Sequence, residues 1–411
     1  MTVTTSARDR VAALLDQHTP GSMLPGPMYH DAEVHAADLD LIWHREWVFA
    51  GHEAELAETG AYLTLTVGAY PLIVVRGVDG ELRALHNVCR HRGALVCSAP
   101  SGNTRRKLVC PYHQWAYDLD GSLAKARSMP ADLDGSQLGL GRAHVATASG
   151  LVFVCVAETP PPFEPFAALA ADHLAPYGLA GAKVAYESTF VEQGSWKLVM
   201  ENNRECYHCR LSHPELAKTF PLAPIHSGSA SEEEARATAE LVATCEAAGL
   251  ASDFRMSDDF QYRVMRMALE GGSRSMTMDG EPAVARRWPG LPGEDAVRDV
   301  GDVLLYHYPS TWMHFQGDHV LTLRMLPLSP TTTELRTAWL VPGDAVEGED
   351  YDLKTLTEVW LATNEQDAAL VERTQRGVLS PAFRPGPYSP VEEEGVLQFV
   401  DWYTARLRAA L

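Results

Sequence analysis

The sequence lacks any uninterrupted run of about 20 apolar residues, the length that a membrane-spanning helix needs. Its first residues, MTVTTSARDRVAALLDQHTPGSM, also lack the apolar core of a secretory signal peptide. We therefore expect a cytoplasmic protein without a membrane partner. Basic residues are few, since 34 Lys and Arg stand against 54 Asp and Glu, a formal net charge of −20. Such a chain does not attract phosphate backbones, so we expect no nucleic-acid partner.

Cysteine is scarce, with 7 residues in a chain of 411. An odd number spread over a long chain does not resemble a disulfide framework, and the clustering of cysteines beside histidines favours metal binding in a reducing compartment. A GxGxxG motif after a strand is absent as well. A nicotinamide cofactor, if the reaction uses one, is therefore expected on another polypeptide.

Short β-rich runs dominate the chain from about residue 60 to 156, among them AYLTLTVG, PLIVVRG and GLVFVCVA. Turn signals at Asp79-Gly80 and Asp120-Gly121 separate several of these runs. This pattern predicts a small antiparallel β domain.

A proline-rich stretch, AETPPPFEPF at 157–166, marks a boundary, and beyond it strand-like runs are flanked by long helical patterns. One of these patterns predicts a helix over about 353–376. The predicted fold class is therefore α+β. We expect an N-terminal helical segment at 1–50 that packs on the catalytic domain, the small antiparallel β domain at 51–160, and a larger α+β domain with an antiparallel sheet and helices at 161–411.

The first candidate metal site lies in the β domain, where CRHRG offers Cys89 and His91 and CPYHQW offers Cys110 and His113. Two thiolates and two imidazoles are also a structural zinc set, which is the alternative interpretation. Zinc fingers, however, group cysteine with cysteine and histidine with histidine, whereas each loop here offers one of each. A 2Fe-2S cluster with two cysteines on one iron and two histidines on the other fits this order.

This stretch resembles the Rieske motif, including the additional Gly93 and Trp115 of the Rieske oxygenase version. Imidazole ligands raise the potential of such a cluster to somewhere between about −150 and +300 mV. Cys97 lies in the same region but does not match the motif, so we interpret it as an ordinary thiol. A Rieske cluster only moves electrons, and a second site must use them.

The second candidate site is in ENNRECYHCRLSH, where His208 and His213 would point about 140° apart on an uninterrupted helix. Both can face one ion only if the helix breaks between them. Pro214 disfavours the α region for the residue before it. We therefore predict that His208 ends a helix and that His213 approaches from the following turn.

A carboxylate ligand is predicted on the late helix, where Asp367 lies about 20° from Leu356 in helical projection. That direction is the centre of an apolar stripe formed by Val359, Trp360, Thr363, Leu370, Val371 and Thr374. A buried carboxylate needs a cation, so Asp367 either pairs with a core Arg or His or completes a facial triad for Fe(II) with the two histidines.

Glu205 stands three residues before His208, on the same face if the segment is helical, and is predicted to hydrogen-bond that imidazole. An exposed helix glutamate is the alternative. Cys206 and Cys209 form a CxxC that could bind zinc with the two histidines. On a helix, His208 points about 200° from Cys206, so this zinc site would require the segment to unwind.

With both sites in view, the chain resembles the α subunit of a Rieske non-haem iron oxygenase. Within that family it resembles the branch that acts on quaternary ammonium compounds, which includes glycine betaine monooxygenase and stachydrine demethylase. The resemblance covers nearly the whole chain. Its motifs are HNVCRHRG, KLVCPYHQW, WKLVMENNRECYHC, SHPEL, SMTMDG, YHYPSTW, WLVPGDAVEG, NEQD, RPGPYS and FVDWY.

The resemblance implies a Rieske 2Fe-2S cluster, a mononuclear Fe(II) and O2 as cosubstrate. It makes Cys89, His91, Cys110 and His113 the cluster ligands. It makes His208, His213 and Asp367 the iron ligands. Glu205 becomes a bridge for electrons arriving from a neighbouring subunit's His113, in a homotrimer. A separate flavin and iron-sulfur reductase, using NAD(P)H, is the implied partner.

The function implied is hydroxylation and removal of an N-methyl group from a quaternary ammonium betaine, with release of formaldehyde. Aromatic side chains recognise such ammonium groups, and the candidates are Tyr207, Trp312 and Phe315, each of which could equally be core packing. An aromatic-ring hydroxylating oxygenase and a Rieske electron carrier without a mononuclear iron are the alternatives.

Overall fold

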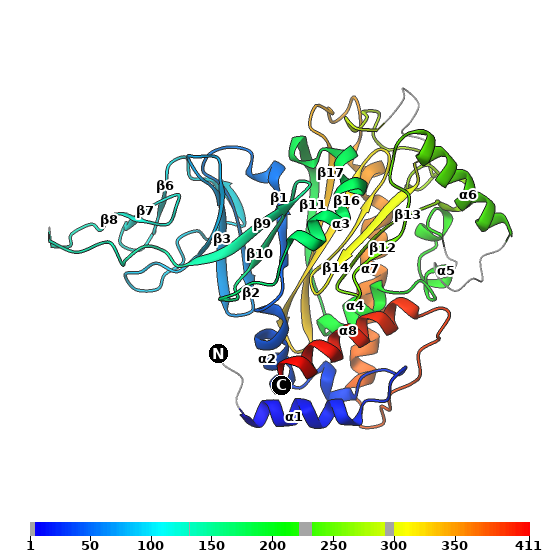
Figure 1. Ribbon diagram of the computed structural model, residues 1–411, viewed down its shortest axis with the longest axis horizontal. Coiled ribbons are helices and arrows are strands. Elements are labelled where there is room, and N and C mark those ends of the chain that lie inside the picture. Colours follow the sequence, from blue (N-terminus) through cyan, green and yellow to red (C-terminus); the bar gives the residue numbers. More distant parts are fainter. Residues whose placement is uncertain (1–4, 131, 222–231, 292–299) are drawn as a thin grey trace.

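The structure, a computed structural model, describes residues 5–130, 132–221, 232–291 and 300–411. The parts of the three predicted segments at 1–4, 131, 222–231 and 292–299 lie outside these residues. Two groups of strands are visible in Figure 1, with the β6–β8 hairpins at one end of the molecule and helices α5 and α6 at the other.

The first half of the chain forms two antiparallel sheets. The larger has seven strands in the order β1-β10-β9-β4-β3-β2-β5, and the smaller has the order β6-β7-β8. The strands of the larger sheet are β1 (Val48–His52), β2 (Ala61–Val67), β3 (Tyr70–Arg76), β4 (Leu82–His86), β5 (Ser101–Asn103), β9 (Arg142–Ala148) and β10 (Leu151–Cys155). Those of the smaller sheet are β6 (Lys107–Val109), β7 (Ala116–Asp118) and β8 (Leu123–Lys125).

The two predicted turn signals connect neighbouring strands of these sheets. Gly80 lies between β3 and β4 with φ +84°, and Gly121 lies between β7 and β8 with φ +91°. Both conformations favour glycine because a Cβ atom disfavours positive φ. The apolar cluster beneath includes two predicted cluster cysteines, with Ile73, Val75, Leu85, Cys89, Val96, Leu108, Cys110, Trp115, Tyr117, Leu119 and Leu140 buried together.

The second half is built on another seven-stranded antiparallel sheet, in the order β11-β17-β16-β15-β14-β13-β12. Its strands are β11 (Ala182–Glu192), β12 (Arg255–Met256), β13 (Tyr262–Met267), β14 (Asp302–His307), β15 (Thr311–Phe315), β16 (Val320–Ser329) and β17 (Thr332–Pro342). The α-helices are α1 (Thr5–Gln17), α2 (Ala32–Asp38), α3 (Glu164–Leu174), α4 (Trp196–Asn203), α5 (Cys209–Ser212), α6 (Glu232–Ala247), α7 (Leu353–Val378) and α8 (Glu394–Ala410).

The predicted α+β class is therefore confirmed, and the long helix expected over about 353–376 is α7. This helix packs against both α4 and β11. Among the residues that the structure describes, no helix is both long and apolar enough to cross a membrane.

Helix α4 is held in place by a buried polar cluster around Asp38 at the end of α2. The carboxylate of Asp38 accepts hydrogen bonds from Trp196 Nε1 at 3.0 Å and from the Tyr403 hydroxyl at 2.7 Å, and it pairs with Lys197. Asp38 and Lys197 are both buried. The cluster joins α2, α4 and α8, and α4 leads directly into the second candidate metal site.

We expect Asp38→Ala to lower the free energy of unfolding by about 3–5 kcal/mol, because it leaves the Lys197 ammonium buried without its partner. Urea unfolding followed by circular dichroism measures this change. Glu365→Ala, which removes an exposed carboxylate from α7, is the matched control and should change stability by less than about 0.5 kcal/mol. Equal effects of the two substitutions would show that the Asp38 cluster does not stabilise the fold.

Candidate metal centres

Two facing loops present the four residues of the first candidate site. Cys89 and His91 follow β4, whereas Cys110 and His113 connect β6 to β7. The first loop closes through hydrogen bonds from the Cys89 N–H to the Ala94 carbonyl and from the Gly93 N–H to the Cys89 carbonyl, each 2.9 Å long. Gly93 has a φ of +77°, which explains the preference for glycine in this tight turn.

The candidate sulfur ligands and the candidate nitrogen ligands lie in separate pairs. Cys89 and Cys110 are buried together in the core of the small domain, and the rings of His91 and His113 have centroids 4.7 Å apart. Trp115 stacks on His91 with a centroid distance of 4.8 Å. The Nδ1 atom of His91 is buried and has no hydrogen-bond partner among the described residues. Two thiols on one side and two imidazoles on the other fit a cluster of two irons better than a single zinc ion.

Hydrogen-bond donors surround the two sulfur atoms. Burial raises the pKa of the Cys110 thiol, while the backbone N–H groups of Tyr112 and His113 act in the opposite direction on it. The hydroxyl of Tyr117 lies 3.2 Å from Cys89 Sγ and can donate to a thiolate there. Donors of this kind stabilise the more negative, reduced state of an iron-sulfur cluster.

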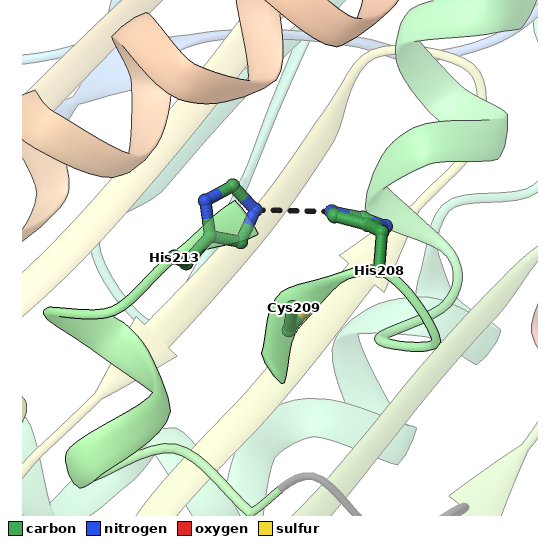
Figure 2. Close-up of side chains that lie close together, drawn as sticks. All are labelled: His208, Cys209 and His213. Carbon is green, nitrogen blue, oxygen red and sulfur yellow. Dashed lines mark hydrogen bonds between the residues drawn. The ribbon is translucent and has the colours of Figure 1, made fainter. Parts of the chain in front are cut away.

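The second candidate site brings together two imidazoles and one carboxylate from distant parts of the chain. The Nε2 atoms of His208 and His213 are 3.0 Å apart, as Figure 2 shows. The Oδ1 atom of Asp367, on α7, lies 3.3 Å from the first of these nitrogens and 3.0 Å from the second. All three candidate ligand atoms therefore converge on one point.

The outer nitrogens of both rings are already engaged. Nδ1 of His208 lies 2.5 Å from Glu205 Oε1, and Nδ1 of His213 lies 2.8 Å from Gln366 Oε1. Because an acceptor oxygen requires a proton on Nδ1, each neutral ring presents the lone pair of Nε2 inward. Two lone pairs and a carboxylate facing one another require a cation between them. The donor set fits a divalent iron with open positions.

The pKa values of the candidate ligands reflect the acidic groups that surround the two imidazoles. Burial opposes protonation of His208, but hydrogen bonds with Asp367 and Glu205 outweigh it and raise the pKa to about 9. The same two histidines lower the pKa of the Asp367 carboxyl, against the effect of its burial. The raised pKa of His208 and the lowered pKa of Asp367 both favour positive charge at the point where the three candidate ligands meet.

The local chain path differs in one respect from the prediction. His213 has φ −123° and ψ 72°, outside the α region as expected before Pro214. His208, however, does not end a helix, because α4 ends at Asn203 and His208 immediately precedes the short helix α5. Glu205 reaches the imidazole from this intervening turn rather than from a shared helical face. The expected contact exists, but the expected reason for it is wrong.

The zinc alternative with Cys206 and Cys209 does not agree with the structure, because these two cysteines form a disulfide. The sulfur of Cys209 and the two imidazoles lie within 4.8 Å of one another, and Figure 2 shows Cys209 at the start of α5, near the two rings. A sulfur already bonded to another sulfur is not a thiolate ligand. This local disulfide was not predicted from the sequence.

A cavity of about 120 Å³ opens beside the three converging ligand atoms. Its described lining comes from α4 and the segment after it, strands β13, β14 and β15 of the second sheet, α7, and the residues at and just before the start of α8. The residues are Asn202, Asn203, Arg204, Glu205, Cys206, His208, Cys209, His213, Leu216, Phe220, Pro221, Arg263, Leu304, His314, Trp360, Thr363, Asp367, Val391, Glu392, Glu394 and Gly395.

The three predicted substrate residues lie in different environments. Trp312 is buried and lines a smaller cavity of about 20 Å³ behind Asp367. Phe315 is fully buried and packs against Tyr177 with a centroid distance of 5.2 Å, and Tyr207 is 65% exposed. The aromatic residues of the main cavity are instead Trp360 and Phe220. Trp360 was already part of the apolar stripe that pointed to Asp367. Phe220, Arg204 and Arg263 also line the cavity, but the sequence gave no signal for them.

Comparison with known families agrees with both donor sets. The family described as "Rieske [2Fe-2S] domain" matches residues 46–147, and the family described as "Ring hydroxylating alpha subunit (catalytic domain)" matches residues 179–409. The chain belongs to the Rieske non-haem iron oxygenases, as a ring-hydroxylating-type alpha subunit. The predicted family, enzyme class and cofactors, a Rieske cluster and a mononuclear iron, are thereby confirmed.

Within this family the chain is similar along almost its whole length to the oxygenase subunit of glycine betaine monooxygenase. It is 42% identical to the subunit from Pseudomonas aeruginosa (strain UCBPP-PA14), covering 98% of this chain and 92% of that protein. It is 43% identical to the one from Chromohalobacter salexigens, covering 99% and 90%. The fold also matches the quaternary ammonium Rieske monooxygenase CntA, with a TM-score of 0.72 and 22% identity over 94% of this chain and 95% of that one.

We expect Tyr117→Phe to lower the reduction potential of the cluster by an amount on the order of 60 mV, equivalent to a tenfold change in a one-electron equilibrium. The substitution removes a donor that favours the reduced state. Redox titration of the visible absorption measures the shift. Tyr112→Phe, which removes the hydroxyl of an exposed tyrosine in the loop between β6 and β7, is the control and should leave the potential unchanged. Equal potentials in Tyr117→Phe and wild type would exclude this role of the hydroxyl.

Proposed function

We propose that the chain is the terminal oxygenase of a system that removes an N-methyl group from a quaternary ammonium betaine of the glycine betaine or stachydrine type. The observation that carries the proposal is the convergence of His208, His213 and Asp367 on one point beside a cavity. The similarity to two glycine betaine monooxygenase oxygenase subunits supports the choice of substrate.

The proposal assigns Cys89, His91, Cys110 and His113 to the Rieske cluster, and His208, His213 and Asp367 to the iron. It keeps the division into segments 1–50, 51–160 and 161–411, with strand β1 (Val48–His52) carrying the chain across the first boundary. A cytoplasmic location is part of the same proposal, because Cys89 and Cys110 must be reduced to bind a cluster, whereas Cys206 and Cys209 are joined in a local disulfide.

The overall reaction consumes O2, two electrons and two protons. One oxygen atom enters a C–H bond of the N-methyl group, and the other leaves as water. The N-hydroxymethyl product then loses formaldehyde, because the C–N bond breaks, its electron pair stays on nitrogen, and nitrogen takes the hydroxyl proton. Bound iron supplies the activation of O2 at its open positions.

The residues of this chain orient the reaction rather than supply its oxidant. Glu205 and Gln366 hold the two imidazoles in one tautomer and one ring orientation. Trp360 and Phe220 give the cavity aromatic faces, which attract a trimethylammonium group that cannot donate hydrogen bonds. Leu216, Leu304 and Val391 add apolar walls to the cavity.

We expect the purified holoenzyme, supplied with a reductase and NAD(P)H, to release formaldehyde from glycine betaine or stachydrine. His208→Ala should abolish release, keep the visible spectrum of the cluster and lower the iron content from about three atoms per chain to about two. Arene oxidation without formaldehyde release would instead identify an aromatic-ring hydroxylase. About two iron atoms in the wild type would identify an electron carrier.

We further propose a homotrimer in which electrons pass from the cluster of one subunit to the iron of the next, with Glu205 as the bridge to the neighbour's imidazole ligand. Within one chain, the β6–β8 hairpins and α5 lie at opposite ends of the molecule in Figure 1, which favours transfer between subunits. The cluster loops and the α5 segment both expose large apolar side chains. They are Val88, Leu95, Val109 and Tyr112 at one end and Tyr207 and Leu211 at the other.

The two ends of the chain expose different surfaces, so one subunit can dock its cluster loops on the α5 segment of the next in a head-to-tail contact. Such contacts close into a ring when the rotation between neighbouring subunits allows it. The separate reductase then delivers electrons to the cluster of each subunit. A reductase partner agrees with the absence of a GxGxxG motif after a strand in this chain.

Coexpression of two inactive variants tests this transfer. His113→Ala disables the cluster and His208→Ala disables the iron, so we expect hybrids of the two to regain activity only if electrons cross between subunits. Each variant alone should stay inactive. Activity that does not exceed that of the separate variants, although mixed oligomers form, would exclude transfer between subunits.

The same hybrids contain an internal control for Glu205. Glu205→Gln should reduce activity when it is placed on the subunit with the intact iron site. On the subunit that carries His208→Ala it should have no effect, because that subunit receives no productive electrons.

A further inference from the structure

Glu192, the last residue of β11, carries a buried carboxyl group with an unpaired oxygen. The residue is 2% exposed, and its Oε2 atom has no hydrogen-bond partner among the described residues. Burying a carboxyl group without a partner costs free energy. In folded proteins, buried polar groups of this kind are satisfied by protein atoms or by ordered water. The surroundings of Glu192 therefore indicate what it binds.

Glu192 lines the small cavity of about 20 Å³ that lies behind Asp367. One water molecule needs roughly 10–15 Å³ of such space and two to four polar partners. Four residues of the lining each have a buried polar atom without a hydrogen-bond partner among the described residues. These atoms are Oε2 of Glu192, Oδ1 of Asn203, Nε1 of Trp360 and Oδ1 of Asp367. The cavity thus has the volume for one water molecule and the polar groups to hold it.

The four residues also match the hydrogen-bonding capacity of water. Burial, and then the negative charge of Asp367, raises the pKa of Glu192 to about 8, so its carboxyl group can donate a hydrogen bond at neutral pH. The indole N–H of Trp360 is a second donor, and Asn203 and Asp367 offer acceptor oxygens. A water molecule accepts two hydrogen bonds and donates two. A single water can therefore satisfy all four residues at once.

Asp367 differs from the other two candidate iron ligands in how it is supported. Glu205 and Gln366 hold the outer nitrogens of the two imidazoles. Among the described residues, the Asp367 carboxylate pairs only with those imidazoles themselves. A group that orients the carboxylate from its outer side is the missing part of the arrangement, because metal ligands are held in place by such outer partners.

We propose that Glu192 is a positioning residue that holds one water molecule against Asp367 and thereby fixes the orientation of this carboxylate for iron binding. The inference rests on the assignment of Asp367 to the iron in the proposed function. It gives each of the three candidate iron ligands a supporting group, two of them direct and one through water.

Two substitutions of Glu192 test the proposal. Glu192→Leu removes the donor to the water and should weaken binding of the mononuclear iron by about 10- to 100-fold. Glu192→Gln keeps an N–H donor in the same place and should bind iron within roughly threefold of the wild type. Competition of the anaerobic holoenzyme with an iron chelator measures this affinity without turnover, and an unchanged visible spectrum shows that the cluster is intact. Unchanged iron affinity in Glu192→Leu would overturn the proposal.

Stability distinguishes positioning from a purely structural role. A leucine in place of the buried carboxyl group relieves its desolvation, so the urea midpoint of Glu192→Leu should be no lower than that of the wild type. A lowered midpoint together with weaker iron binding would show a structural role and overturn the proposal. Leu335→Val, which alters the apolar lining of the same cavity and keeps its polar groups, is the matched control and should bind iron as the wild type does.

A crystal structure of the holoenzyme tests the water directly. We expect one ordered water within hydrogen-bond distance of both Glu192 and Asp367, present in Glu192→Gln and lost in Glu192→Leu. A wild-type structure without this water would overturn the proposal. Asp367→Ala separates the inference from the proposed function. Retention of the third iron atom in Asp367→Ala would refute the assignment of that residue to the iron, whereas its loss, with wild-type affinity in Glu192→Leu, would refute only the role of Glu192.

Discussion

The organisation of the catalytic half depends on three atoms that each carry a lone pair and that approach one point. The Nε2 atoms of His208 and His213 and the Oδ1 atom of Asp367 lie 3.0 to 3.3 Å apart. At these distances their lone pairs repel one another unless a cation lies between them. The surrounding structure is arranged to keep them there. Glu205 and Gln366 fix the ring orientations, and the buried Asp38 cluster holds α4, from which the histidine segment starts.

Much of this arrangement could be predicted because each ligand leaves a local trace in the sequence. Cys89, His91, Cys110 and His113 stand in two short loops whose order favours a split cluster, and the loops themselves follow from flanking β patterns. Asp367 stands out as a carboxylate in an apolar stripe, although Thr374, counted in that stripe, is exposed. Periodicity identifies a helix face, but it does not tell how far that face remains covered at the end of the helix.

Other features have no such trace, because they depend on tertiary contacts. The break after Asn203 places Glu205 and His208 in a turn, and nothing in ENNRECYHC distinguishes this path from a longer helix. The disulfide between Cys206 and Cys209 depends on that same turn. Trp312 and Phe315 are near the motifs in sequence, but adjacent residues of a strand point to opposite faces, and the packing of the sheet decides which face meets the cavity.

Arg204 and Arg263 show why a site has to be considered as a whole. Each arginine looks unremarkable in the sequence, one beside a predicted electron bridge and the other in the strand QYRVMRM. Their significance arises only when β13 and the end of α4 bring both to Tyr306. The cavity is therefore lined by charges of both signs, and their arrangement around one ring follows from tertiary contacts that neither segment shows by itself.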